Sequence, residues 1–378
     1  MNLVSKLAKS YVNTFGWKTH KKIIVIESDD WGSVRMPNKE VLSILSAQNS
    51  KILNDRYSLT DSIANVTDLE KLFEILKKFK DFKGNSPVIS ANTIVGNPDF
   101  KKIKKSNFNS YYYETFDNTI KKLPEGNRIL TLWNEGIDSE IFKPQLHGRE
   151  HLHALLWLEE LKLGNKDLLA AFELKCFGVP YHPILINKRK NLMSALDKNG
   201  FSKESSFHEN YIKDASNVFR TYFGYTAKSF IAPTYIWHPK LEKALKESGI
   251  EYIQGLPIQY IPSNSKNKFR KKLHYTGQKN SLNQLYLTRN VFFEPTSNSN
   301  IDWVSKALVK IDQSFKNRLP AIIGSHRINY IGSLVPDNRD KNLKLLGVLL
   351  MKILQKWPDV EFMSSDVLGE LIINEKSS

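Results

Sequence analysis

The sequence predicts an α/β fold, a barrel in which parallel strands alternate with helices. Short β-branched apolar runs are separated by amphipathic stretches of helical periodicity along most of the 378 residues. The first apolar run, residues 22–31, ends in Asp29 and Asp30. Because parallel α/β folds carry their chemistry at the carboxyl ends of the strands, this run predicts a buried strand and the edge at which a site lies.

The expected strands are short apolar runs bounded by turn residues, about seven in number. They cover residues 22–31, 86–95, 127–134, 228–235, 251–256, 320–326 and 360–365. The helical patterns between them have apolar residues three and four positions apart. They cover residues 67–79, 151–162, 239–248, 302–315 and 341–357.

Two polar segments interrupt this order. Residues 96–123 are rich in Lys, Asn and Tyr and predict a loop or peripheral insertion. Residues 263–283 form another polar insertion, and the alternating run at 284–293 after it predicts a hairpin near the pocket. Loops of this length at one face of a barrel are usually functional.

The domain organisation is expected to be simple. Residues 1–21 have apolar positions at helical spacing with lysines between them, which predicts an amphipathic segment packed on the barrel or lying on a membrane face. Residues 22–370 are expected to form one barrel domain, and residues 371–378 a tail. Neither a secretory-type apolar segment nor an apolar run of transmembrane length is seen, so we expect a cytoplasmic protein.

The composition limits the classes of partner. The formal net charge is +16, but the lysines are scattered and no nucleic-acid motif accompanies them, so no nucleic-acid partner is expected. A lysine-rich proteome explains this charge, and attraction to an anionic glycan or to the inner face of a membrane is the alternative. The single cysteine, Cys176, excludes an intrachain disulfide and a cysteine zinc cluster. The oligomeric state stays open.

His147 and His151 predict a metal site. Histidines four positions apart on one helical turn can reach one cation, and a carboxylate completes a triad with room for water. One aspartate of the 29–30 pair can bind the metal while the other takes a proton from metal-bound water. The alternatives are solvated histidines at a helix start and aspartates that cap a helix. The expected ion is zinc, with cobalt, manganese or nickel as alternatives.

Five stretches resemble the motifs of the polysaccharide deacetylase family, the carbohydrate esterase family 4-like group. They are Ser28–Trp31, His147–His151, Ile231–Tyr235, Asp302–Trp303 and Ile322–His326, and together they extend over about residues 22–370. Four match in the expected order, with Asp302–Trp303 a loose match, and Ile231–Tyr235 keeps only the proline of the third motif. The resemblance implies a distorted (β/α) barrel with loop insertions and a divalent metal held by Asp30, His147 and His151. It implies Asp29 as the catalytic base, and His326 is placed to protonate the leaving group. The expected substrate contacts are Trp31, Arg149, Pro233, Tyr235, Trp303 and Arg327.

One position departs from that family. The family's third motif has an arginine that orients the base aspartate, and Ile231 stands there in this sequence. We predict that Arg149 or Arg327, each beside a site histidine, holds Asp29 instead, since a guanidinium can grip a carboxylate bidentately. The alternative is that both arginines face solvent or bind substrate anions.

The resemblance implies a metal-dependent deacetylase that removes an N- or O-acetyl group from a saccharide, such as a precursor of a cell-surface glycan. Two alternatives stay open: a non-catalytic carbohydrate-binding protein on the same fold, and a metal-dependent glycoside hydrolase that uses Asp29 and Glu135 as its carboxylates. No serine nucleophile elbow, Walker loop or dinucleotide glycine fingerprint is present, which argues against serine esterase, phosphoryl-transfer and NAD chemistry.

Overall fold

A curved sheet of nine strands forms the centre of the computed structural model, which describes residues 10–377 except 179–191, 199, 201 and 264–268. Eight strands follow the order β10-β7-β6-β5-β2-β1-β12-β11, and β13 pairs with β1. Their ladders are parallel, so the predicted α/β barrel of parallel strands is confirmed. The strands are β1 (Lys22–Trp31), β2 (Ile89–Ile94), β5 (Phe142–Gly148), β6 (Ser229–Ile231), β7 (Tyr252–Gly255), β10 (Leu285–Thr288), β11 (Val291–Phe292), β12 (Ala321–His326) and β13 (Val360–Phe362).

Strand β1 is the central element of this sheet. It pairs with β2, β12 and β13, and all its residues except Lys22 are buried. In a strand that is buried on both faces, every side chain lies in an apolar environment, so apolar and polar residues need not alternate. This explains why residues Ile23–Ile26 are all apolar and buried. The same pairing brings the carboxyl ends of β1 and β12 together, with Asp29 opposite His326.

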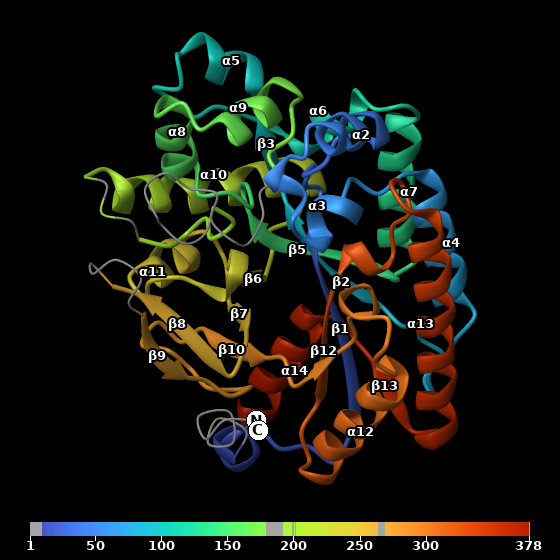
Figure 1. Ribbon diagram of the computed structural model, residues 1–378. Coiled ribbons are helices and arrows are strands. Elements are labelled where there is room, and N and C mark those ends of the chain that lie inside the picture. Colours follow the sequence, from blue (N-terminus) through green and yellow to red (C-terminus); the bar gives the residue numbers. More distant parts are fainter. Residues whose placement is uncertain (1–9, 179–191, 199, 201, 264–268, 378) are drawn as a thin grey trace.

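Helices cover the outside of the sheet. Figure 1 shows α4, α7 and α13 along one side and α10 and α11 along the other. Buried apolar residues of these helices belong to the main core cluster together with strand residues. These outer helices are α4 (Val66–Lys77), α6 (Phe116–Lys121), α7 (Gly126–Asp138), α10 (Glu204–Phe223), α11 (Leu241–Glu247), α12 (Trp303–Lys316), α13 (Pro336–Lys356) and α14 (Ser365–Ser377).

Shorter helices lie over the upper end of the strands in Figure 1, and several of them share a second apolar cluster. They are α2 (Lys39–Ala47), α3 (Arg56–Thr60), α5 (Phe100–Lys105), α8 (Ala154–Lys162) and α9 (Lys166–Glu173). Two small antiparallel sheets of two strands each accompany the barrel, β3 (Gly96–Pro98) with β4 (Tyr113–Thr115) and β8 (Ile258–Pro262) with β9 (Phe269–Leu273). Residues 96–123, predicted as a loop, therefore hold β3, α5, β4 and α6.

Two expected elements were wrong. Residues 127–134 form part of helix α7 instead of a strand, because Ile129, Leu132, Trp133 and Gly136 recur at helical spacing and are buried together. The strand that follows is β5, which the sequence analysis did not identify. The run at 284–293 is not a hairpin either. Its two halves, β10 and β11, pair in parallel with β7 and β12 at opposite ends of the sheet order.

The ends of the chain pack against the barrel as far as they are described. Residues 1–9 of the expected amphipathic segment lie outside the described residues, and residues 10–15 are helical. Val12 is buried, and the rings of Tyr11 and Phe15 lie 5.5 and 6.0 Å from that of Tyr275. At the other end, α14 runs through residue 370, where a tail was expected to begin. None of the described helices is long and apolar enough to cross a membrane.

Candidate functional site

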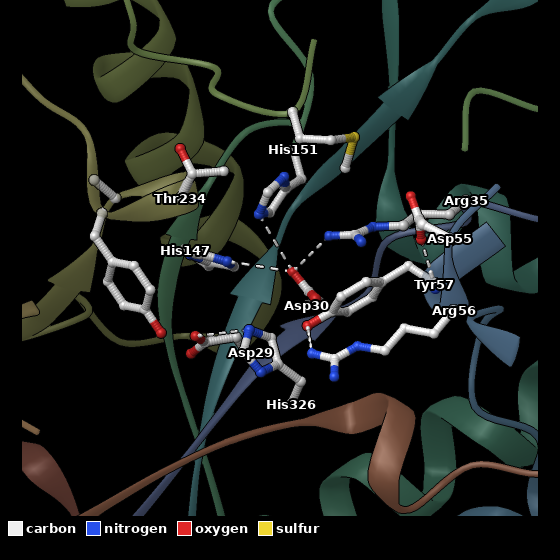
Figure 2. A pocket seen from close by; sticks show the side chains of 13 residues that line it. Asp29, Asp30, Arg35, Asp55, Arg56, Tyr57, His147, His151, Thr234 and His326 are labelled. Carbon is white, nitrogen blue, oxygen red and sulfur yellow. Dashed lines mark hydrogen bonds and ion pairs between the residues drawn. The ribbon is translucent and has the colours of Figure 1, made fainter. Parts of the chain in front are cut away.

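A cavity of about 490 Å³ lies at the carboxyl ends of the central strands. Figure 2 shows carboxylates, imidazoles and guanidinium groups converging on it. Its lining residues come from the ends of β1, β5 and β12, from η2 (Pro233–Tyr235) and from the segment around α3. They include Asp29, Asp30, Arg35, Arg56, Tyr57, His147, His151, Thr234, Tyr235 and His326.

Both aspartates of β1 reach this cavity because the strand is irregular at its end. Successive side chains of a regular strand point to opposite faces of the sheet. Here the pairing of β1 with β2 shifts register between Ser28 and Trp31, and Asp30 has a left-handed backbone with φ 75°. Such a bulge re-aims side chains, so adjacent carboxylates face one space. Strained backbone of this kind is concentrated at functional sites.

The two histidines come together through a second irregularity rather than through a helical turn, so the predicted helical geometry was wrong. His147 lies in β5, where the pairing with β2 shifts register after Thr93, and Gly148 follows with φ 115°. His151 lies in the turn beyond the strand. The two ring centroids are 5.1 Å apart.

Asp30, His147 and His151 have the geometry of a metal-binding group. Their ligand atoms lie within 4.8 Å of one another, and Asp30 Oδ1 is 3.4 and 3.5 Å from the Nε2 atoms of the two histidines. His147 Nδ1 lies 2.9 Å from the carbonyl oxygen of Ile231, a contact that leaves Nε2 as the metal-facing atom. Asp30 Oδ1 accepts no hydrogen bond from any described residue. The donor set fits a divalent ion such as zinc.

Arg35 lies beside this group and sets its protonation. Burial alone would raise the pKa of Asp30, but the Arg35 guanidinium, 3.1 Å from Asp30 Oδ1, holds it well below its usual range. Burial and the same guanidinium keep the pKa of His151 well below its usual value. Asp30 is therefore an anion and His151 a neutral imidazole, the forms in which they bind a metal.

Arg289 holds Asp29. Its Nη1 and Nη2 donate to Asp29 Oδ2 and Oδ1 at 2.7 and 2.6 Å, and its Nε donates to Glu27 at 2.6 Å. Burial alone would raise the pKa of Asp29, but the Arg289 guanidinium lowers it to about 2. Arg289 lies between β10 and β11, and Gly324 leaves room for it, since a Cβ there would meet Arg289 Cδ at 2.6 Å.

His326 faces Asp29 across the top of β1 and β12. Its Nε2 lies 3.7 Å from Asp29 Oδ2, and its Nδ1 bonds to Glu294 at 2.5 Å. Burial alone would lower the pKa of His326, but the Glu294 carboxylate raises it to about 9. The site therefore holds a protonated imidazole against an ionised aspartate. Tyr57 covers this pair, with its ring centroid 5.7 Å from that of His326.

The structure corrects the arginine prediction. Arg149 binds Glu150 and Asp214, Arg327 binds Asp61, and neither reaches Asp29. Both are buried next to carboxylates of their own, and neither lines the cavity. An arginine does hold Asp29, but it is one that the sequence analysis did not consider.

The structure places the other five residues considered for the site as follows. Tyr235 lines the cavity, and its hydroxyl accepts a hydrogen bond from Arg289 at 3.0 Å. Trp31 is buried away from it, with its Nε1 donating to Ser28 Oγ, and Pro233 supports the η2 turn without lining the cavity. Trp303 lines a neighbouring cavity instead. Glu135, considered as a second carboxylate, lies on α7 and pairs with Arg128.

Arg35, Arg289 and Glu294 were not predicted from the sequence. Arg289 directly follows the apolar run that forms β10, so a strand-end arginine was a usable signal. Arg35 and Glu294 lie in irregular segments, where periodicity gives no information.

Comparison with known proteins identifies the family. The family model described as glycosyl hydrolase family 57 matches residues 15–290, well over half of the chain. No curated protein matches the sequence. Solved structures of similar fold include a putative polysaccharide deacetylase from Mycobacterium smegmatis, with 9% identity, a TM-score of 0.47 and coverage of 95% of this chain and 93% of that one.

Two further solved structures of similar fold are enzymes of carbohydrates by name. A branching enzyme from Thermococcus kodakaraensis has 12% identity and a TM-score of 0.44, covering 95% of this chain and 72% of its own. A 4-alpha-glucanotransferase from Thermococcus litoralis has 11% identity and a TM-score of 0.43, covering 93% of this chain and 40% of its own.

The resemblance to the polysaccharide deacetylase family, and with it the expected deacetylase activity, is overturned by the family match. The resemblance depended on a few short motifs, whereas the family model matches residues 15–290, from the segment before β1 to the link between β10 and β11. The chain belongs to glycosyl hydrolase family 57.

Proposed function

We propose that this protein hydrolyses a glycosidic bond in a carbohydrate, and that Asp29 and His326 act on that bond. Membership of glycosyl hydrolase family 57 supports the reaction class. The observation that carries the residue assignment is the 3.7 Å contact between Asp29 Oδ2 and His326 Nε2 in the lining of the cavity. The lowered pKa of Asp29 and the raised pKa of His326 make this pair an aspartate anion beside a protonated imidazole. These groups match the two demands of glycoside cleavage, a proton for the leaving oxygen and a negative charge near the sugar.

His326 is the proton donor. Glu294 holds Nδ1, so Nε2 is the atom that faces the cavity and the glycosidic oxygen. With a pKa raised to about 9, the imidazole carries its proton at neutral pH. Positioned proton transfer of this kind typically contributes about 10²- to 10⁴-fold to a rate.

Asp29 stabilises charge. A carboxylate whose pKa is lowered to about 2 is a weak base, so its contribution is the negative charge that it places beside the sugar as positive charge develops there. Its 3.7 Å distance from His326 is shorter than the ~5 Å between the carboxyl groups of retaining glycosidases, so we propose no covalent intermediate on Asp29. Water adds directly to the sugar carbon as the bond to the leaving oxygen breaks. The proton that the water loses passes to solvent, from which His326 is protonated again.

The same cavity is proposed to bind a divalent metal ion, zinc in the first instance, through Asp30, His147 and His151. The support is the cluster of ligand atoms within 4.8 Å and the contact of His147 with the Ile231 carbonyl. A bound ion would bind and polarise water beside the sugar. Metal analysis of the purified protein should give about one ion per chain, as one three-ligand site implies. Asp30→Ala should lose that ion, and equal metal content in both proteins would exclude this ligand set.

The test of hydrolysis is product analysis with a panel of oligosaccharides. The protein should release new reducing ends, and Asp29→Asn and His326→Gln should each lower turnover by about 10²-fold or more. Asp214→Asn is the control, since it removes a half-exposed carboxylate paired with Arg149 outside the cavity. Full turnover in Asp29→Asn, or acetate release without new reducing ends, would refute the proposal.

A further inference from the structure

A second cavity of about 450 Å³ adjoins the first. Both cavities are lined by Arg56, Tyr235 and His326. The two cavities therefore meet at His326, the proposed proton donor. The first cavity is about large enough for one or two sugar rings by comparison with typical ligand sites of ~300–1,000 Å³. A longer saccharide that passes His326 therefore enters the second cavity.

Three of the residues that line this second cavity carry positively charged side chains. Lys306 and Lys310 lie one turn apart on α12 and share its face toward the cavity, and Arg56 lies across from them on α3. Glu294 is the one acidic side chain among the described lining residues, and its two oxygens already bind His326 and Asn329. The described lining residues thus include three cations, and the one acidic side chain among them already has two partners.

Aromatic surface lies beside these cations. Phe292, at the end of β11, is 36% exposed, and Trp303 lies under Lys306, whose Nζ is 4.3 Å from the ring centroid. A flat apolar ring packs against the C–H face of a sugar, and nearby cations bind its acidic substituents. The aromatic surface suits neutral and acidic sugars alike, whereas the cations favour an acidic one.

We propose that this second cavity is a subsite for an acidic sugar, one that carries a carboxylate, sulfate or phosphate, and that Lys306, Lys310 and Arg56 bind the anionic group. The inference rests on the proposed function, because it makes the sugar next to the cleaved bond the acidic one. Phe292 forms the floor for the ring. The high net charge of +16 acts in the same direction by drawing acidic saccharides to the molecule.

The experiment compares acidic and neutral oligosaccharides of equal length with the full-length protein. The wild type should cleave the acidic series with the higher kcat/KM. In Lys306→Ala/Lys310→Ala the ratio of kcat/KM for acidic over neutral substrates should fall at least tenfold. Lys316→Ala is the matched control, since it removes an exposed lysine of the same helix that pairs with Asp312. Carboxylated, sulfated and phosphorylated substrates distinguish the source of the anion.

Direct binding separates this inference from the proposed function. Calorimetry with Asp29→Asn, which keeps the second cavity, should show acidic saccharides binding at least tenfold more tightly than neutral ones, and Lys306→Glu should abolish the preference. Binding with no cleavage by the wild type would refute the hydrolase assignment and leave the subsite standing. Cleavage or binding without any preference for acidic saccharides would overturn the subsite.

Discussion

Arg289 binds two carboxylates of one strand with one guanidinium. Its Nε donates a hydrogen bond to Glu27, its two Nη atoms donate to Asp29, and all three side chains are buried. Arg289→Lys should lower the free energy of unfolding by about 3 kcal/mol, because an ammonium cannot span both acids and leaves one buried charge poorly paired. It should also raise the pKa of Asp29, so that the loss of activity at acidic pH, the acidic limb of the pH–rate profile, begins at a higher pH than in the wild type. Denaturant unfolding and pH–rate profiles measure the two effects.

Arg149→Lys provides the comparison. Arg149 is also buried and also binds two acids, but it does not line the cavity. This variant should lose stability without moving the acidic limb. If the limb of Arg289→Lys also stays in place, Arg289 supports the fold alone.

Glu294 controls the protonation of His326, the proposed proton donor. His326 acts in its protonated form, which is lost as the pH rises through a pKa of about 9. Glu294→Gln removes the negative charge that raises this pKa, so the alkaline loss of activity should begin at lower pH than in the wild type. A pH–rate profile measures the shift. Asp340→Asn, which removes an exposed carboxylate paired with Arg339, should leave the alkaline limb unchanged.

At the scale of elements, the irregular strand ends position the site. Bulges in β1 and β5 turn Asp30 and His147 toward one space, and each bulge is followed by a glycine with positive φ, Gly32 and Gly148. A regular ladder would have sent alternate side chains into the helix-covered face of the sheet. The site therefore depends on backbone conformations that few residues other than glycine adopt.

Gly148→Ala tests this dependence. A Cβ at this position would lie 2.0 Å from Tyr211 Oη, a hydroxyl that donates to the carbonyl of Glu150, and the φ of 115° is unfavourable for alanine. We expect a loss of about 3 kcal/mol or more in the free energy of unfolding, from backbone strain and overpacking together. Gly164→Ala, with φ 76° and nothing within 4 Å, should lose only about 1 kcal/mol. Equal losses in denaturant unfolding would contradict the argument.

At the scale of the whole molecule, charge should control substrate capture. A protein of net charge +16 attracts acidic saccharides over distances that salt shortens, since the Debye length is about 10 Å at 0.1 M salt and about 3 Å at 1 M. Raising the salt concentration across this range should lower kcat/KM for acidic oligosaccharides about tenfold or more through KM, and change neutral ones little. Steady-state kinetics at several salt concentrations measure this, and parallel salt curves for both substrate types would count against the acidic subsite.

The sequence by itself determined the parts of the fold that depend on local pattern. Continuous apolar runs such as residues 22–31 and 320–326 predicted buried parallel strands, and the polar residues that end them, Asp29, Asp30 and His326, line the cavity. The histidine pair at 147 and 151 was identified from spacing, although its strand-and-turn geometry was not. Local periodicity records which face of an element is buried, and that information is present in a short window.

Only the tertiary structure decided which distant residues complete the site. Arg289 lies 260 positions from Asp29 in the sequence. It lies in the short link between β10 and β11, the strands at opposite ends of the sheet order, and from this link its side chain reaches Asp29 in β1. The sheet order and register also bring Glu294 into hydrogen-bonding contact with His326, and Arg35 into an ion pair with Asp30. The family assignment shows the same limit, since motifs of one or two residues fit more than one family. Pairing between remote segments depends on the sum of many packing contacts, and no short window of sequence contains that sum.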